Sequence, residues 1–141
     1  MAKALILYHS KTGTTKKLSY SIRDFIKTMD IESRAIPIEN YVAGDLNGID
    51  IIILGCWTSG LFIVMQHPEK EWIDFANTLP DLSSKKIVLF TTYKLLTGSM
   101  FVSMKKHLKI QSGQIGLTFK SRNSALSESN QLKLKEFIIS N

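Results

Sequence analysis

The chain has 141 residues, of which 44% are hydrophobic and 21% charged, as is typical of a single globular domain spanning residues 1–141. No apolar run approaches the roughly 18 residues of a membrane span, and the first residues follow a strand pattern and not that of a signal peptide, so we expect a cytoplasmic protein without membrane insertion. The single cysteine, Cys56, excludes an internal disulfide and a cysteine-based zinc site, while the formal charge of +6 favours an anionic ligand or partner.

Residues 4–16 form the most informative segment of the chain. Their order predicts a buried strand that runs directly into a hydroxyl-rich turn and then a helix. A helix start offers backbone N–H groups without intrahelical partners, so such a junction is suited to a phosphate. The candidate phosphate-binding residues are Ser10, Lys11, Thr12, Gly13, Thr14 and Thr15. The alternative is a strand followed by an ordinary Ser/Thr-capped helix, which needs only one of these hydroxyls.

The rest of the chain alternates strands and helices. Further strands are predicted over residues 33–38, 50–55, 86–92 and 115–120, and helices over residues 15–29, 69–79, 100–108 and 128–139. The second and third of these strands contain continuous apolar runs, as expected where helices cover both faces of a sheet. Residues 39–48 contain too much glycine for a long helix, and Ser127 is predicted to cap the last helix. This alternation predicts a parallel sheet with right-handed crossovers.

Several other nucleotide and phosphate sites are excluded by the residues present. The chain has neither the P-loop motif nor the G-x-G-x-x-G turn of dinucleotide-binding domains. It lacks the strand-end acidic residues of a receiver domain, and Phe62 stands where a Cys-x5-Arg phosphatase loop requires arginine. The three histidines have no metal-like mutual spacing, so each is predicted to be a surface or loop residue, and we expect no metal site.

The order of these segments resembles that of the short-chain flavodoxins over essentially the whole chain. Residues 10–15 are similar to the T/S-x-T-G-x-T phosphate loop of that family, at the turn after the first strand. Residues 54–60 and 89–93 match the places of its two flavin-contacting loops. The resemblance implies a doubly wound α/β fold, a three-layer sandwich around a five-stranded parallel sheet of order 2-1-3-4-5, with FMN at the carboxyl edge.

The resemblance also implies which residues surround the flavin ring. The first flavin loop contributes Cys56, Trp57, Thr58, Ser59 and Gly60, and the second contributes Thr91, Thr92, Tyr93, Lys94 and Gly98. Here Trp57 stands earlier in its loop than the family tryptophan, and the second loop lacks the usual Gly-Asp element. Trp57 and Tyr93 are candidates to stack on the flavin, and the alternative for both is a packing role in the core. Cys56 is predicted to be a small buried residue beside the flavin and not a nucleophile, because no base is identifiable near it.

The resemblance implies an FMN-binding electron carrier with no catalytic side chains. One alternative is a flavin-dependent reductase of a small substrate such as a quinone or a tetrapyrrole, for which the apolar residues 61–65 would wall a pocket. A weaker alternative is a flavin-free relative with the same fold. Lys11, Lys16 and Lys94 lie in or beside the cofactor loops, and residues 56–68 contain no acid. We therefore expect redox partner proteins with acidic docking surfaces, and no nucleic-acid partner.

Overall fold

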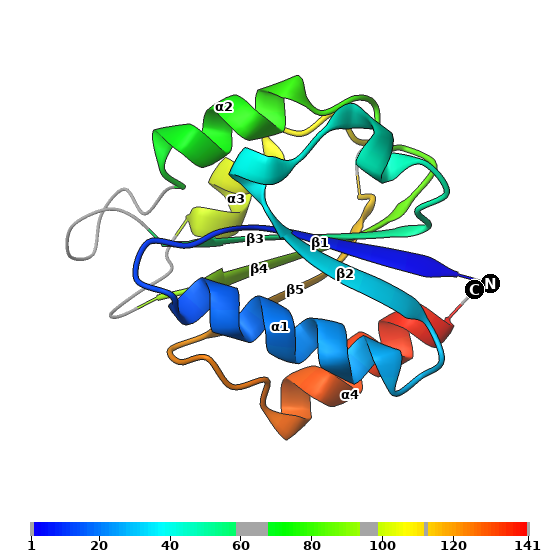
Figure 1. Ribbon diagram of the computed structural model, residues 1–141. Coiled ribbons are helices and arrows are strands. Elements are labelled where there is room, and N and C mark those ends of the chain that lie inside the picture. The colour runs from blue at the N-terminus through cyan, green and yellow to red at the C-terminus, as the bar shows by residue number, and fades with distance from the viewer. Residues whose placement is uncertain (1, 59–67, 94–98, 112, 141) are drawn as a thin grey trace.

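The protein is described by a computed structural model that covers residues 2–58, 68–93, 99–111 and 113–140. Five parallel strands form one sheet in the order β2-β1-β3-β4-β5, which confirms the predicted topology (Figure 1). The strands are β1 (Lys3–His9), β2 (Glu32–Pro37), β3 (Ile51–Trp57), β4 (Lys86–Thr92) and β5 (Ile115–Ser121). Each lies within two residues of its predicted bounds. The continuous apolar runs of β1, β3 and β4 identify strands that are buried on both faces, whereas the edge strands β2 and β5 are only partly buried.

Helices cover both faces of this sheet, and Figure 1 shows them as two layers. They are α1 (Thr14–Lys27), α2 (Lys70–Thr78), α3 (Met100–Lys105) and α4 (Glu128–Ile139). On α1, Leu18, Ile22 and Ile26 recur every four residues and are fully buried against the sheet, as an amphipathic helix requires. The predicted cap of α4 is confirmed, because the Ser127 hydroxyl accepts a hydrogen bond from the Asn130 amide.

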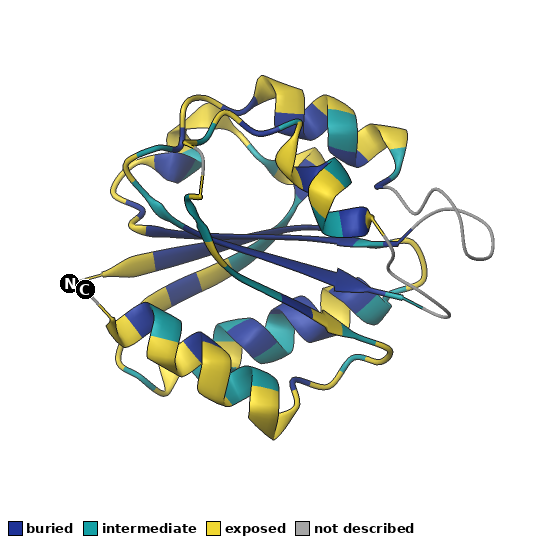
Figure 2. Ribbon diagram, turned by 180° about the vertical axis from the view of Figure 1, so that it is seen from behind, coloured by how far each residue is buried: buried dark blue, intermediate teal, exposed yellow. Residues whose placement is uncertain are grey.

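Two hydrophobic clusters separate the layers. Alternate residues of β1 point to opposite faces, so Leu5 and Leu7 pack with α2 and α3, whereas Ile6 packs with α1 and α4. Figure 2 shows the central strands β1, β3 and β4 buried between helices whose outer surfaces are exposed. The sheet is therefore fixed from both sides, which holds the strand ends that carry the candidate site.

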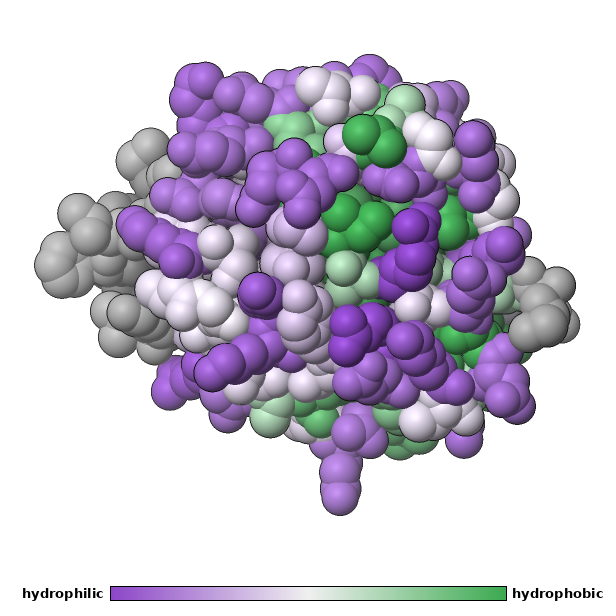
Figure 3. Space-filling view, viewed as in Figure 1, coloured by the Kyte–Doolittle hydropathy of each residue, from purple (hydrophilic) through white to green (hydrophobic). Residues whose placement is uncertain are grey.

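Residues 38–46 contain two short 3₁₀ helices, Ile38–Asn40 and Ala43–Leu46. This confirms the prediction that residues 39–48 form no long helix. Helix α3 ends at Lys105, three residues before the predicted end. The face seen in Figure 3 is mostly hydrophilic. Within the part of the chain that the structure describes, none of the helices has the length and hydrophobicity of a membrane-spanning segment.

Candidate functional site

The carboxyl ends of β1, β3 and β4 lie side by side and bring three predicted loops together. In the sheet register His9 pairs with Cys56, Cys56 with Thr91, and Trp57 with Thr92. Strand β2 lies on one side of β1, and β3 lies on the other side. The strand order therefore reverses between β1 and β3, which flank the switch point of the sheet. In open α/β sheets, ligands bind in the crevice at such a point.

The loop after β1 presents hydrogen-bond donors at the start of α1. Gly13 adopts a left-handed conformation with φ 94°, and nothing lies within 4 Å of the position that a Cβ would take. The Ser10 hydroxyl accepts hydrogen bonds from the amides of Gly13, at 3.1 Å, and Lys16, at 3.2 Å. Thr14 and Thr15 begin the helix, so their amides have no intrahelical acceptor. Thr12 is exposed on the same loop.

A pair of buried hydroxyl contacts connects the three loops. The hydroxyl oxygens of Thr15 and Thr92 lie 2.6 Å apart, although the two residues are separated by 77 positions in the chain. Those of Thr58 and Thr91 lie 2.8 Å apart, and the Thr91 hydroxyl also lies 2.7 Å from the Cys56 carbonyl oxygen, which it can donate to. All four threonines are buried. In each pair only one hydroxyl donates to the other, so the Thr15–Thr92 pair keeps one hydrogen for a further acceptor.

Glu69 connects the Trp57 side chain to β1. This residue was not among the site residues predicted from the sequence. Its Oε1 atom accepts from the indole Nε1 of Trp57 at 2.7 Å and from Nε2 of His9 at 2.8 Å. The Lys11 ammonium lies 4.8 Å from the centre of the Trp57 ring. The prediction that His9 is a surface or loop residue is wrong, because His9 ends β1 and its side chain is only 15% exposed.

The charge state of Glu69 follows from these contacts. Burial raises the pKa of its carboxyl, but hydrogen bonds from His9 and Trp57 and the charge of Lys11 outweigh burial and leave the pKa below its usual value. A carboxylate therefore lies against Trp57, although residues 56–68 contain no acid. His9, Glu69 and Glu71 each place one ligand atom within 4.8 Å of the others, but His9 and Glu69 already bond to each other.

Tyr93 follows β4 at the same edge and is half-buried. The Lys120 ammonium lies 5.6 Å from the centre of its ring and the Arg122 guanidinium lies 5.4 Å from it. The Tyr93 amide donates to the Ser121 carbonyl oxygen at 3.1 Å, which fixes Tyr93 against the end of β5. Four other predicted site residues, Ser59, Gly60, Lys94 and Gly98, lie outside the described residues.

Cys56 is fully buried within β3. Burial raises the pKa of its thiol well above the usual value, and the negative charge of Glu69 raises it further. A thiol held in its protonated form is a poor nucleophile, which agrees with the predicted packing role.

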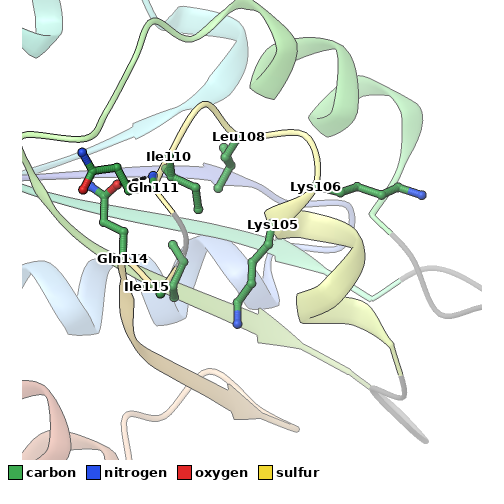
Figure 4. A pocket seen from close by; sticks show the side chains of 8 residues that line it. Lys105, Lys106, Leu108, Ile110, Gln111, Gln114 and Ile115 are labelled. Atoms are coloured by element: carbon green, nitrogen blue, oxygen red, sulfur yellow. Dashed lines mark hydrogen bonds between the residues drawn. The ribbon is translucent and has the colours of Figure 1, made fainter.

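A pocket of about 390 Å³ lies at the opposite end of the sheet (Figure 4). Its lining includes Lys105, Leu108, Ile110 and Gln114, which precede β5. The Gln114 amide nitrogen donates to the carbonyl oxygens of Leu82 and Lys85, just before β4 begins. The pocket is therefore at the amino edge and does not belong to the three loops.

A family model described as the flavodoxin domain matches residues 5–113, about three quarters of the chain. The chain belongs to the flavodoxin family. This membership confirms the family resemblance and the electron-carrier function predicted from the sequence. Flavodoxins typically bind FMN. The loop after β1 of this flavodoxin fits that cofactor, because it places hydrogen-bond donors at a helix start beside buried hydroxyls. Residues 10–15 also contain no acidic side chain that would repel a phosphate.

Individual relatives agree with this assignment. The chain is 27% identical over 127 residues to a flavodoxin of Maridesulfovibrio salexigens, in an alignment that covers 85% of this chain and 86% of that protein. A shorter alignment, 32% identical over 60 residues, relates 43% of this chain to 38% of a probable flavodoxin 1 of Bacillus subtilis. The crystal structure of oxidised Flavodoxin 1 from Bacillus cereus matches with a TM-score of 0.69 at 22% identity and covers 97% of each chain. This last match shows the shared fold.

Proposed function

We propose that this flavodoxin binds FMN at the carboxyl edge of its sheet and carries electrons between redox partner proteins. The observation that carries the proposal is the loop after β1, where Gly13 leaves open space and the amides of Thr14 and Thr15 offer donors beside exposed and buried threonine hydroxyls. An anion is stabilised there by the unpaired amides and by the positive end of the helix dipole. The FMN phosphate is the anion that the family membership implies.

The proposed site uses residues from all three loops. The phosphate is assigned to Ser10, Lys11, Thr12, Gly13, Thr14 and Thr15, and the flavin ring to Cys56, Trp57, Thr58, Thr91, Thr92 and Tyr93. The assignments of Ser59, Gly60, Lys94 and Gly98 remain predictions from the sequence. We propose further that residues 1–141 form one domain, which is supported by the union of all five strands in one sheet. The cytoplasmic location also stays a prediction.

Bound FMN supplies one- and two-electron chemistry, so the protein needs no catalytic side chain of its own. The residues of this chain bind the cofactor and hold its surroundings fixed. If Thr92 donates to Thr15, the Thr15 hydrogen is left to donate to the phosphate, and the two hydroxyls form a polarised chain. Glu69 and Lys11 hold Trp57 from two directions, so its ring has a defined orientation at the proposed site.

FMN titration tests this proposal. The purified protein should take up one FMN, with quenching of tryptophan fluorescence. Thr12→Val should weaken FMN binding by about one to two decades, since a hydrogen bond to a charged group contributes about 1.5–3 kcal/mol. Riboflavin, which has no phosphate, serves as the control and should bind both proteins equally. A protein that takes up no FMN would instead support the flavin-free alternative.

The reductase alternative depends on residues 61–65, which lie outside the described residues. No described contact favours a substrate pocket beside the three loops. Turnover of quinones by the FMN-loaded protein, compared with reduction of acceptor proteins, separates the reductase from the carrier.

A further inference from the structure

The positive charge of this flavodoxin is concentrated in one part of the chain. Residues 82–127 contain eight of the 18 lysines and arginines and none of the 12 aspartates and glutamates. This segment therefore carries a formal charge of +8, and the rest of the chain carries a formal charge of −2. It includes β4, α3 and β5, and its cations lie at both ends of these strands, with Lys85 and Lys86 at the start of β4 and Lys120 and Arg122 at the end of β5.

Two cations of this segment lie at the proposed flavin site, beside Tyr93. Strands β4 and β5 are neighbours in the sheet (Figure 1). Thr92 pairs with Ser121 in the sheet register, so Tyr93 and Arg122 follow the carboxyl ends of these two strands. Lys120 and Arg122 are exposed, and both place their charges within 6 Å of the centre of the Tyr93 ring. Two cations on one half-buried ring, beside a ligand crevice, form a compact positive surface.

Acidic groups of the same edge lie on both sides of this surface. Glu69 and Glu71 belong to the start of α2, and Glu69 is already paired with His9 and Trp57. Glu39 follows β2 at the far end of the sheet order, and Glu128 begins α4 after β5. The positive surface is therefore a local one around Tyr93, where Lys120 and Arg122 lie close to one ring.

We propose that this flavodoxin docks an acidic redox protein on the surface formed by Tyr93, Lys120 and Arg122. The inference rests on the proposed function, because the flavin must lie beside Tyr93 for docking there to shorten the path of the electron. Complementary charge accelerates encounter and fixes orientation, and its effect falls as salt screens it. An acidic partner is attracted to the two neighbouring cations, Lys120 and Arg122, which brings it to the side of the crevice where Tyr93 lies.

Stopped-flow kinetics with two probe proteins tests the proposal. The FMN-loaded protein is reduced with dithionite and mixed with an acidic plastocyanin or a basic cytochrome c. One electron passes in each case, reducing copper(II) to copper(I) or iron(III) to iron(II). We expect the plastocyanin rate to fall by about tenfold between about 10 mM and 500 mM salt, and the cytochrome c rate to stay level or rise.

Matched variants locate the surface. Arg122→Glu should slow plastocyanin reduction about fivefold at low salt, and Arg122→Gln should give about half that effect on a logarithmic scale. The control Lys105→Glu changes the net charge equally but lies at the pocket of the amino edge, so its rate should stay within about 1.5-fold of the parent. Equal slowing by Arg122→Glu and Lys105→Glu would overturn the proposed location. A plastocyanin rate that rises with salt would overturn the acidic partner.

A binding measurement separates this inference from the proposed function. Copper(I) plastocyanin is titrated into the ¹⁵N-labelled protein, with and without FMN, and amide shifts are followed. Shifts centred on Tyr93, Lys120 and Arg122 would support the docking surface even in a protein that takes up no FMN. Shifts elsewhere, in a protein that binds FMN normally, would reject the docking surface alone.

Discussion

Removal of the Glu69 carboxylate should loosen the contact between the first flavin loop and β1. A single oxygen of Glu69 accepts from both Trp57 and His9, at 2.7 and 2.8 Å, and the side chain is 25% exposed. In Glu69→Ala both donors lose their protein acceptor in partly buried surroundings. The Lys11 cation also loses the carboxylate with which its charge interacts.

The expected size follows from the hydrogen bonds. A hydrogen bond to a charged group contributes about 1.5–3 kcal/mol when buried, but water reaches this site, so we expect Glu69→Ala to lower the free energy of unfolding by about 1–2 kcal/mol at pH 7. Glu69→Gln should lose about half of that, because its amide oxygen still accepts from Trp57. Urea unfolding followed by far-UV circular dichroism measures both values.

The effect should depend on pH with a defined sign. The folded-state pKa of Glu69 lies below its usual value of 4.5, so its stabilising effect is fully present above that pH and is lost as pH falls through the folded-state pKa. The stability gap between the parent and Glu69→Gln should therefore be constant from about pH 6 to 7 and shrink below about pH 4.5. A Trp57→Phe background should remove part of the gap, since the two residues are coupled. Equal urea midpoints for the parent and Glu69→Ala at pH 7, where the carboxylate should stabilise the fold fully, would refute the argument.

Three further variants test other contacts of the structure. Thr92→Val removes the partner of the buried Thr15 hydroxyl, so FMN affinity in a fluorescence titration should fall about fivefold while riboflavin affinity changes little; equal losses would contradict a role at the phosphate. Gly55→Ala places a methyl group 2.0 Å from the Phe90 ring, and chemical unfolding should show a loss of about 2–3 kcal/mol, unless Phe90 repacks freely. Ser10→Ala removes the acceptor of two loop amides, so thermal unfolding should show a loss of about 1 kcal/mol, and an unchanged midpoint would show that water replaces the hydroxyl.

The sequence predicts the fold well because its signals are local. The run of residues 51–54 is apolar at every position, and the helical spacing of Leu18, Ile22 and Ile26 marks one buried face, so each element is identified within its own segment. The 3₁₀ helices of residues 38–46 gave no such signal, because a single turn carries no repeated hydrophobic spacing. Helix α3 was predicted to continue to residue 108, but a turn at residues 106–107 replaces its last helical turn.

The contacts of the site were harder to predict because they join distant parts of the chain. The Thr15–Thr92 pair spans 77 positions and the His9–Glu69 pair spans 60, and no spacing rule connects them. Glu69 comes directly after the acid-free segment of residues 56–68, so the sequence alone did not place an acid beside the flavin loops. In the structure Glu69 lies at the start of α2, where its carboxylate accepts a hydrogen bond from Trp57. The folded arrangement of helices and strands brings such residues together, and no spacing along the sequence does.

Lys11 provides a test of whether the charge around the site tunes the flavin. Its ammonium lies above the Trp57 ring at 4.8 Å, and the same loop is assigned to the FMN phosphate. A unit charge acting over about 10 Å contributes about 0.4–0.8 kcal/mol at an effective dielectric of about 40–80, which is about 20–35 mV for one electron. Lys11→Met removes the charge and keeps most of the side-chain length, so it should lower the potential for adding the second electron by about that amount at low salt.

The control for Lys11→Met is Lys133→Met on α4, which removes an equal charge away from the three loops. Both potentials are measured by spectroelectrochemistry at low and high salt. The shift in Lys11→Met should shrink with salt, because screening weakens an exposed charge, while Lys133→Met should match the parent throughout. Equal potentials for all three proteins would mean that Glu69 neutralises Lys11 at the flavin. In that case Glu69→Gln should raise the potential, since it would leave the lysine charge uncompensated.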